Sequence, residues 1–188
     1  AEVVLVDDLV NPDILQFAPA QCKIIPVGKR GGCRSTPQAF IQRLMLRYAR
    51  QGKTVVRLKG GDPMLFGRGG EEVAFLAEHG IACQVVNGLT AGLVAATQAD
   101  IPLTHRDHTQ GVTFITGHRR DGSQPNWPAL VAGGTTLVVY MGMQNINVLC
   151  QEWRQAGMPE TMPAAVIQHA STPQQRILIS ELSRLAAD

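Results

Sequence analysis

The chain has 188 residues, of which 45 % are hydrophobic and 17 % charged, and its 17 basic and 15 acidic residues leave a formal net charge of +2. A chain of this length can bury about 70 % of its unfolded surface, so one large or two small folded domains are expected. The composition excludes a disordered chain, a collagen and a coiled coil, and the small net charge argues against a protein that coats a polyanion.

In the first half of the chain, predicted strands alternate with predicted helices. A continuous β-branched run over residues 2–6 is typical of a strand buried on both faces. Asn11 and Pro12 have the pattern of a helix start, before a short helix over residues 14–17. Further strands are expected over residues 23–27, 54–58 and 82–86.

Two longer helices are expected between these strands. Thr36 and Pro37 should begin the first, which ends at Gly52 and has its apolar positions at helical spacing: Phe40, Ile41, Leu44, Met45 and Tyr48. The acids Glu71 and Glu72 suit the first turn of the second, which runs to about His79.

The second half repeats the alternation after an irregular segment. Helices are expected over residues 90–97, after residue 128 and over 145–156, and strands over 112–116, 135–140, 164–168 and 175–180. The segment over residues 101–111 interrupts the alternation, so we place a domain junction there and expect an N-terminal domain over 1–108 and a C-terminal domain over 109–188. The fold class is α/β with mostly parallel sheets.

Cysteine usage and hydropathy limit the compartment and the kind of site. Cys22, Cys33, Cys83 and Cys150 form no CxxC pair and have no histidine at a ligand spacing, which favours reduced core thiols over a zinc site or disulfides. No apolar stretch reaches the roughly 18 residues of a membrane helix, and the first residues lack the basic region of a secretory signal. A cytoplasmic protein is expected.

The glycine-rich segment over residues 59–72 is the strongest local sign of a ligand site. Ligands of open α/β sheets bind beyond the carboxyl ends of the strands, and this segment follows a predicted strand directly. It has neither the GK[ST] ending of a phosphate loop nor the GxGxxG spacing of a dinucleotide site. Gly60 and Gly61 would let the backbone approach a ligand closely, with Asp62 accepting hydrogen bonds, although a purely structural turn is the alternative.

Asp7 and Lys29 are candidate proton-handling residues because each follows a predicted strand. A partly desolvated carboxylate such as Asp7 can act as a general base, but most carboxylates at this position cap the next helix, and Asp8 competes for the role. Lys29 can donate a proton or hold a carboxylate, but a lone lysine is more often a solvated surface charge.

Basic residues gather in three predicted loops: Lys29, Arg30 and Arg34; His105 and Arg106; and His118, Arg119 and Arg120. If the loops converge, they form a pocket for a small molecule with several carboxylates, and otherwise they are ordinary solvated loops. Aromatic residues make up only 5 % and do not alternate with the basic ones, so no nucleic-acid partner is expected.

Eight segments, in order, resemble the tetrapyrrole methylase family, and within it the uroporphyrinogen III C-methyltransferases, including the methylase half of siroheme synthases. They are VDDLV, VGKRGG, VVRLKGGDPMLFGRGGEE, VVNGLTAG, IPLTHRD, TGH, LVVYMG and AVIQHAST. The resemblance covers nearly the whole chain, and eight motifs in register are highly specific.

The resemblance implies two α/β/α domains with a cofactor cleft between them, and a homodimer. It implies transfer of methyl groups from S-adenosyl-L-methionine to two adjacent pyrrole rings of uroporphyrinogen III, which gives S-adenosyl-L-homocysteine and precorrin-2 for siroheme and cobalamin biosynthesis. No metal is implied. The alternatives are a methylase of a later corrin intermediate and a non-catalytic module that binds the cofactor or a porphyrinogen.

The resemblance also implies roles for individual residues. Asp7 and Lys29 match the proton acceptor and donor. The cofactor-binding positions are Gly60, Gly61, Asp62, Leu65, Thr90, Ala91, Met141 and Ala170, and the substrate-binding positions are Arg68, Glu71, Arg106 and His118. Ala170 stands where the family favours glycine. In the family, a further strand with a glycine-rich cofactor loop comes before the position of Ala1, and a final strand comes after that of Asp188, so we expect this chain to be part of a longer protein.

Overall fold

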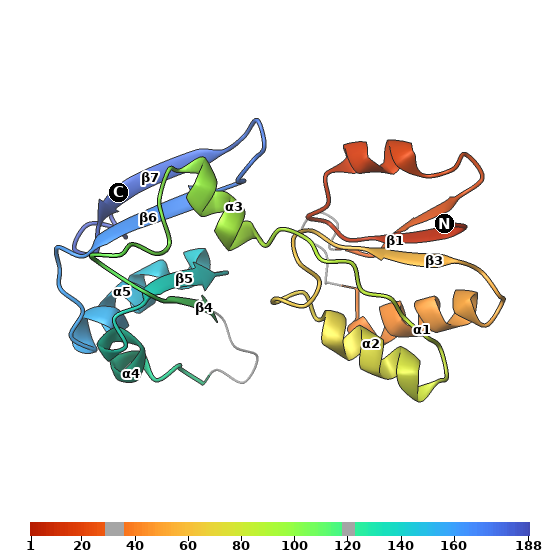
Figure 1. Cartoon of the computed structure of the whole chain (residues 1–188), viewed down its shortest axis with the longest axis horizontal. Coiled ribbons are helices and arrows are strands. Elements are labelled where there is room, and N and C mark those ends of the chain that lie inside the picture. Colours follow the sequence, from red (N-terminus) through yellow and green to blue (C-terminus); the bar gives the residue numbers. More distant parts are fainter. Residues whose placement is uncertain (29–35, 118–122) are drawn as a thin grey trace. The chain divides into compact units, whose positions relative to one another are not determined.

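The computed structural model describes residues 1–28, 36–117 and 123–188 (Figure 1). It divides into two compact units, residues 1–90 and residues 91–188. The α/β class is confirmed.

The first unit is built on a three-stranded parallel sheet in the order β2-β1-β3. Its elements are β1 (Val3–Val6), the 3-10 helix η1 (Pro12–Phe17), β2 (Lys23–Pro26), α1 (Gln38–Ala49), β3 (Val55–Leu58) and α2 (Gly69–Glu78). The helices α1 and α2 lie on one face of the sheet and η1 on the other (Figure 1). The central strand β1 is buried along its whole length, as its β-branched run predicts.

The core of this unit lies between the sheet and α1. Val3 and Leu5 of β1 pack with a helical stripe that includes Ile41, Met45 and Tyr48. The stripe follows the i, i+4, i+7 spacing of one helix face. Phe40 was predicted on this face, but it is 48 % exposed because it lies one residue to the side of the stripe.

The predicted strand over residues 82–86 is wrong. These residues form no strand, and Val86 is 75 % exposed. Val85 and Val86 favour a strand, but a strand also needs a partner for its backbone hydrogen bonds. Strand β1 is paired on both sides, and no other strand among the described residues pairs with residues 82–86.

Two helix starts differ in detail from the predictions. The short helix after Asn11 is a 3-10 helix, and the Asp13 amide donates to the Asn11 side-chain oxygen at 3.0 Å, so the predicted cap is confirmed. Helix α1 begins at Gln38 with Pro37 as its N-cap residue. The Thr36 hydroxyl does not cap it and instead donates to the Gly28 carbonyl at 3.4 Å.

The described part of the second unit contains two separate two-stranded sheets. Strands β4 (Val112–Thr116) and β5 (Thr136–Tyr140) are parallel, and β6 (Pro163–Gln168) and β7 (Arg176–Glu181) are antiparallel. Its helices are α3 (Ala91–Gln98), α4 (Trp127–Ala132), the 3-10 helix η2 (Met143–Asn145) and α5 (Ile146–Gln155).

The core of the second unit centres on two tryptophans in α4 and α5. The Trp127 and Trp153 rings meet edge to face, with centroids 5.6 Å apart. The Trp127 indole N–H donates to the Glu152 carboxylate at 2.8 Å. Cys150 is buried in this core, as predicted, whereas Cys83 is exposed and Cys22 is half-buried, so the expectation of core thiols is wrong for Cys83.

Helix α3 belongs to the second unit. The Gly92 amide donates to the Tyr140 hydroxyl at 2.7 Å, and α3 contacts β5. The compact units therefore divide between Thr90 and Ala91, and the domain boundary at residue 108 stays a prediction. None of the helices in the described ranges is long and apolar enough to cross a membrane.

Candidate functional site

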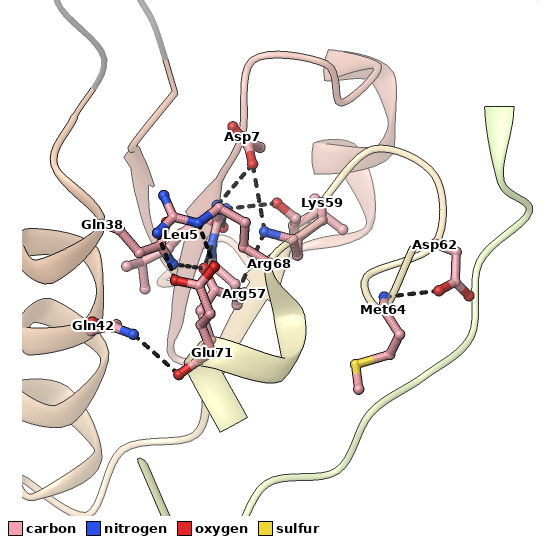
Figure 2. Close-up of polar contacts among 12 residues, drawn as sticks. Leu5, Asp7, Gln38, Gln42, Arg57, Lys59, Asp62, Met64, Arg68 and Glu71 are labelled. Carbon is pink, nitrogen blue, oxygen red and sulfur yellow. Dashed lines mark hydrogen bonds and ion pairs between the residues drawn. The ribbon is translucent and has the colours of Figure 1, made fainter. Parts of the chain in front are cut away.

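Asp7 lies at the carboxyl end of the sheet of the first unit, within a cluster of charged side chains. Because β1 and β3 are parallel with Val6 opposite Leu58, the residues that follow the two strands are neighbours. Asp7 Oδ2 lies 2.8 Å from Arg57 Nη2 and 3.8 Å from Lys59 Nζ (Figure 2). The side chain of Asp7 is 36 % exposed, so it is held by cations and still reachable from solvent.

A buried carboxylate from α2 completes the cluster. Glu72 is 5 % exposed, and its carboxylate lies 3.2 Å from Arg57 Nε and 3.6 Å from Lys59 Nζ. It also accepts a 2.9 Å hydrogen bond from the Gln38 amide of α1. We call Asp7, Arg57, Lys59 and Glu72 the strand-end cluster; two of its members are cations and two are carboxylates, so their charges balance.

Burial lowers the pKa of Lys59. The neighbouring Arg57 acts in the same direction, while Glu72 and Asp7 oppose the shift. The two carboxylates therefore stabilise the charged form of Lys59 against its burial.

The structure excludes one of the two interpretations of Asp7. Asn11, and not Asp7, caps η1, so the helix-capping interpretation does not hold. The second oxygen of Asp7, Oδ1, accepts a 3.1 Å hydrogen bond from the Asp8 amide. Asp8 itself is exposed. The carboxylate with an organised environment is therefore Asp7.

The glycine loop that follows Lys59 packs against residues near Gly88, backbone to backbone. Gly61 has φ +76°, in the left-handed region that favours glycine, and a Cβ on Gly88 would overlap the Gly61 carbonyl oxygen. Asp62 accepts from the Met64 amide at 2.8 Å (Figure 2) and from the Gly88 amide at 3.3 Å. Gly60 and Leu65 belong to the same loop, exposed and half-buried respectively. The fold thus needs glycine here for loop packing.

Arg68 and Glu71, which match substrate positions, form an exposed ion pair with each other. Arg68 Nε and Nη2 donate to the two oxygens of Glu71 at 2.9 and 2.6 Å (Figure 2). This hydrogen bonding raises the pKa of Arg68. Arg68 has φ +58°, an unusual value for a residue with a side chain, and directly precedes α2.

Positive φ values occur at one predicted cofactor residue of the second unit, Met141, and on both sides of another, Ala170. Met141 follows β5 with φ +57° and is 58 % exposed. Ala170 is half-buried and lies after β6, between His169 at φ +51° and Ser171 at φ +62°. Such strain concentrates at functional sites, so both strand ends are candidates for ligand contact.

The remaining predicted residues have varied surroundings. Thr90 is buried at the end of the first unit, and Ala91 is exposed at the start of α3. Arg106 is exposed and lines a small open pocket with Thr104, His105, Thr109 and Gln110. Lys29 and His118 lie outside the described residues, as do two of the three basic loops. Among the residues that the structure describes, no group of three His, Cys, Asp or Glu side chains is arranged to hold a metal ion.

Sequence reasoning assigned no individual catalytic or binding role to three members of the strand-end cluster: Arg57, Lys59 and Glu72. One signal was available, because Arg57 interrupts an apolar strand run, VVRL, at a half-buried position. A charged residue at such a position needs a buried partner. The identity of that partner depends on how α2 packs, which the pattern does not give.

Comparisons with known proteins identify the family of the chain. Residues 1–186 match the family model described as Tetrapyrrole (Corrin/Porphyrin) Methylases. The chain is 55 % identical over 188 residues to a uroporphyrinogen-III C-methyltransferase of Pseudomonas aeruginosa. The alignment covers the whole chain and 76 % of that relative. It is 51 % identical over 188 residues to a siroheme synthase of Azotobacter vinelandii, of which it covers 40 %.

A solved structure agrees in fold as well. The uroporphyrin-III C-methyl transferase of Thermus thermophilus, complexed with S-adenyl homocysteine, superposes with a TM-score of 0.83 at 38 % identity, covering the whole chain and 79 % of that structure. The resemblance and the fold expected from the motifs are both confirmed. This chain belongs to the tetrapyrrole methylase family.

Proposed function

We propose that this chain catalyses S-adenosyl-L-methionine-dependent C-methylation of uroporphyrinogen III at two adjacent pyrrole rings, giving precorrin-2 for siroheme and cobalamin biosynthesis. The observation that carries the proposal is the 55 % identity over the whole chain to a uroporphyrinogen-III C-methyltransferase. The strand-end cluster supports it, because it presents a half-exposed carboxylate that two cations hold in place.

Bound S-adenosyl-L-methionine supplies a methyl group that is already electrophilic on its sulfonium. The protein's residues therefore need to align the two reactants and move protons, without a covalent nucleophile. Asp7 takes the proton that leaves the ring system after methylation, and Lys29 is its proposed counterpart as proton donor. Asp7 suits this role because Arg57 fixes one of its oxygens at 2.8 Å, while the side chain stays 36 % exposed.

The glycine loop fits a cofactor that contacts backbone. Gly60 and Gly61 offer peptide groups without side chains, and Asp62 holds the loop in shape through the Gly88 amide. The proposed cofactor-binding residues are Gly60, Gly61, Asp62, Leu65, Thr90, Ala91, Met141 and Ala170.

The substrate carries acetate and propionate arms, which arginine pairs with well. Arg68, Arg106 and His118 are proposed to bind these arms, with Glu71 orienting Arg68 through their two hydrogen bonds. Binding a carboxylate at Arg68 would compete with that ion pair. The proposal is completed by a homodimer in the cytoplasm.

The test is methylation of uroporphyrinogen III by the full-length protein, measured as labelled methyl groups transferred per tetrapyrrole. We expect two per molecule, and Asp7→Asn should lower kcat by about 10²- to 10⁴-fold, the usual contribution of a general base. Asp13→Asn, an exposed aspartate in η1, is the matched control. Unchanged turnover in Asp7→Asn would remove Asp7 from the mechanism.

Two further measurements, substrate competition and calorimetry, separate the alternatives. A methylase of a later corrin intermediate would prefer that intermediate over uroporphyrinogen III in direct competition. A non-catalytic module would bind S-adenosyl-L-homocysteine in calorimetry and transfer no methyl group to either acceptor.

A further inference from the structure

Glu72 is a buried charged group that the proposed reaction does not use directly. It lies in the first turn of α2 and is 5 % exposed. A buried carboxylate is costly unless it is paired, and Glu72 is paired three times, with Arg57, Lys59 and Gln38. These partners come from three places in the first unit: β3, the residue that follows β3, and α1.

The two cations each connect Glu72 to Asp7. Arg57 faces Glu72 with Nε at 3.2 Å and Asp7 with Nη2 at 2.8 Å. Because the guanidinium is planar and rigid, fixing its Nε edge also fixes the direction in which Nη2 points. Arg57 Nη1 donates to the Leu58 carbonyl at 3.1 Å, which gives the plane a third attachment.

Lys59 makes a second connection of the same kind. Its ammonium lies 3.6 Å from Glu72 and 3.8 Å from Asp7, and its side chain is 9 % exposed. The ionisable groups facing it are Asp7 after β1, Arg57 of β3 and Glu72 of α2. The two carboxylates stabilise the charged form of Lys59, whereas burial and Arg57 disfavour that form.

We propose that Glu72 is a positioning residue for Asp7: through Arg57 and Lys59 it fixes the orientation of the Asp7 carboxylate and keeps a cation beside it. The inference rests on the proposed function, because it assigns Glu72 a part in proton removal by Asp7. Glu72 itself does not touch the reacting atoms.

The proposal predicts a specific kinetic pattern for Glu72→Gln. The amide keeps the shape but loses the charge, so Arg57 is less firmly held and the Asp7 carboxylate gains freedom. We expect kcat to fall by about 10- to 100-fold, the scale of a misplaced catalytic group. The KM for uroporphyrinogen III and the Kd for S-adenosyl-L-homocysteine should stay within about two-fold, since the cofactor loop is unchanged.

The pH profile gives a readout that a purely structural role would not move. Without the Glu72 charge, the pKa of Lys59 falls further, because an attraction that raises it is lost. The alkaline limb of kcat should therefore shift to lower pH in Glu72→Gln. Glu78→Gln, the same substitution at an exposed position on α2, is the matched control and should keep the wild-type profile.

A second variant covers the case in which Glu72→Gln does not fold. Glu72→Asp retains the charge but withdraws it by one methylene, so it should fold, lower kcat and leave the alkaline limb nearly in place. A folded variant that keeps both the wild-type kcat and the wild-type pH profile would overturn the proposal. Failure of both variants to fold would also overturn it, because Glu72 would then contribute to stability alone. If the wild-type protein transfers no methyl group, the proposed function fails instead.

Discussion

Replacing Arg57 by methionine tests how much the strand-end cluster contributes to the stability of the first unit. Methionine keeps most of the apolar stem and removes the guanidinium. The change deletes the ion pairs to Glu72 at 3.2 Å and to Asp7 at 2.8 Å, and the hydrogen bond to the Leu58 carbonyl at 3.1 Å. The side chain of Arg57 is only 10 % exposed, so water does not replace these partners fully.

The loss in the free energy of unfolding depends on which charged partner of Arg57 stays buried after the substitution. Removing one member of a buried ion pair costs about 3–5 kcal/mol, because the other charge stays buried and unpaired. Glu72 keeps Lys59 at 3.6 Å and Gln38 at 2.9 Å, which favours the lower end of that range. The pair with the more exposed Asp7 adds at most about 1 kcal/mol. We therefore expect the free energy of unfolding to fall by about 3 kcal/mol.

Urea denaturation followed by two probes measures this change and locates it. Both tryptophans, Trp127 and Trp153, lie in the second unit, so their fluorescence reports that unit, whereas far-ultraviolet circular dichroism reports both. With a slope of about 2 kcal/mol per molar urea, the midpoint of the first unit should fall by about 1.5 M. Arg43→Met, at an exposed position on α1, should change it by less than about 0.3 M. A loss below about 1 kcal/mol in Arg57→Met would refute the reasoning.

Three further changes have defined outcomes. Gly88→Ala should weaken S-adenosyl-L-homocysteine binding by more than about 10-fold in calorimetry, because the new methyl group displaces the glycine loop. A loss of about 1.4 kcal/mol in binding free energy is enough for a factor of 10. Gly70→Ala, which has open space around the new methyl group, should leave binding unchanged. Lys59→Gln should alter the pH dependence of stability, because the pKa of Lys59 is lower in the folded protein than in the unfolded chain. The free energy of unfolding of the wild type, relative to that of the variant, should therefore rise with pH between the lowered pKa and 10.5. A difference that does not change with pH would contradict this. Trp127→Phe should cost about 1–3 kcal/mol in urea denaturation, since Glu152 loses a 2.8 Å hydrogen bond, and a cost under about 0.5 kcal/mol would show that water replaces it.

The strands that the sequence predicts correctly are those whose partner also comes from a clear apolar run. The expected strand over residues 112–116 is observed as β4 with the same ends, paired with β5. The run over residues 82–86 was expected to be a strand as well, but no described strand pairs with it, and it is exposed. Local composition specifies an extended backbone, whereas strand pairing depends on residues far away in the sequence.

The candidate site shows the same division. Asp7 was predicted because it follows a strand, and the parallel register places it beside the residues that follow β3. Its partner Arg57 lies 50 positions away, and Glu72 comes from a helix whose rotation the sequence pattern did not specify. The prediction singled out Glu71 in that helix turn, which is exposed and paired with Arg68, whereas the adjacent Glu72 is the buried one.

The position of the strand-end cluster is better explained by chemistry than by stability. Replacing a buried ion network by apolar side chains of similar volume is often neutral or stabilising by about 1–4 kcal/mol, so four charges are not needed to hold this sheet together. They lie at the carboxyl end of the strands, where α/β proteins bind ligands, and the only member with substantial exposure is Asp7. The proposed base must be reachable by the substrate as well as oriented, and the partly exposed Asp7 carboxylate, held by Arg57 and Lys59, meets both requirements. We therefore infer that the first unit retains these charges because Asp7, as the proposed base, needs a fixed direction.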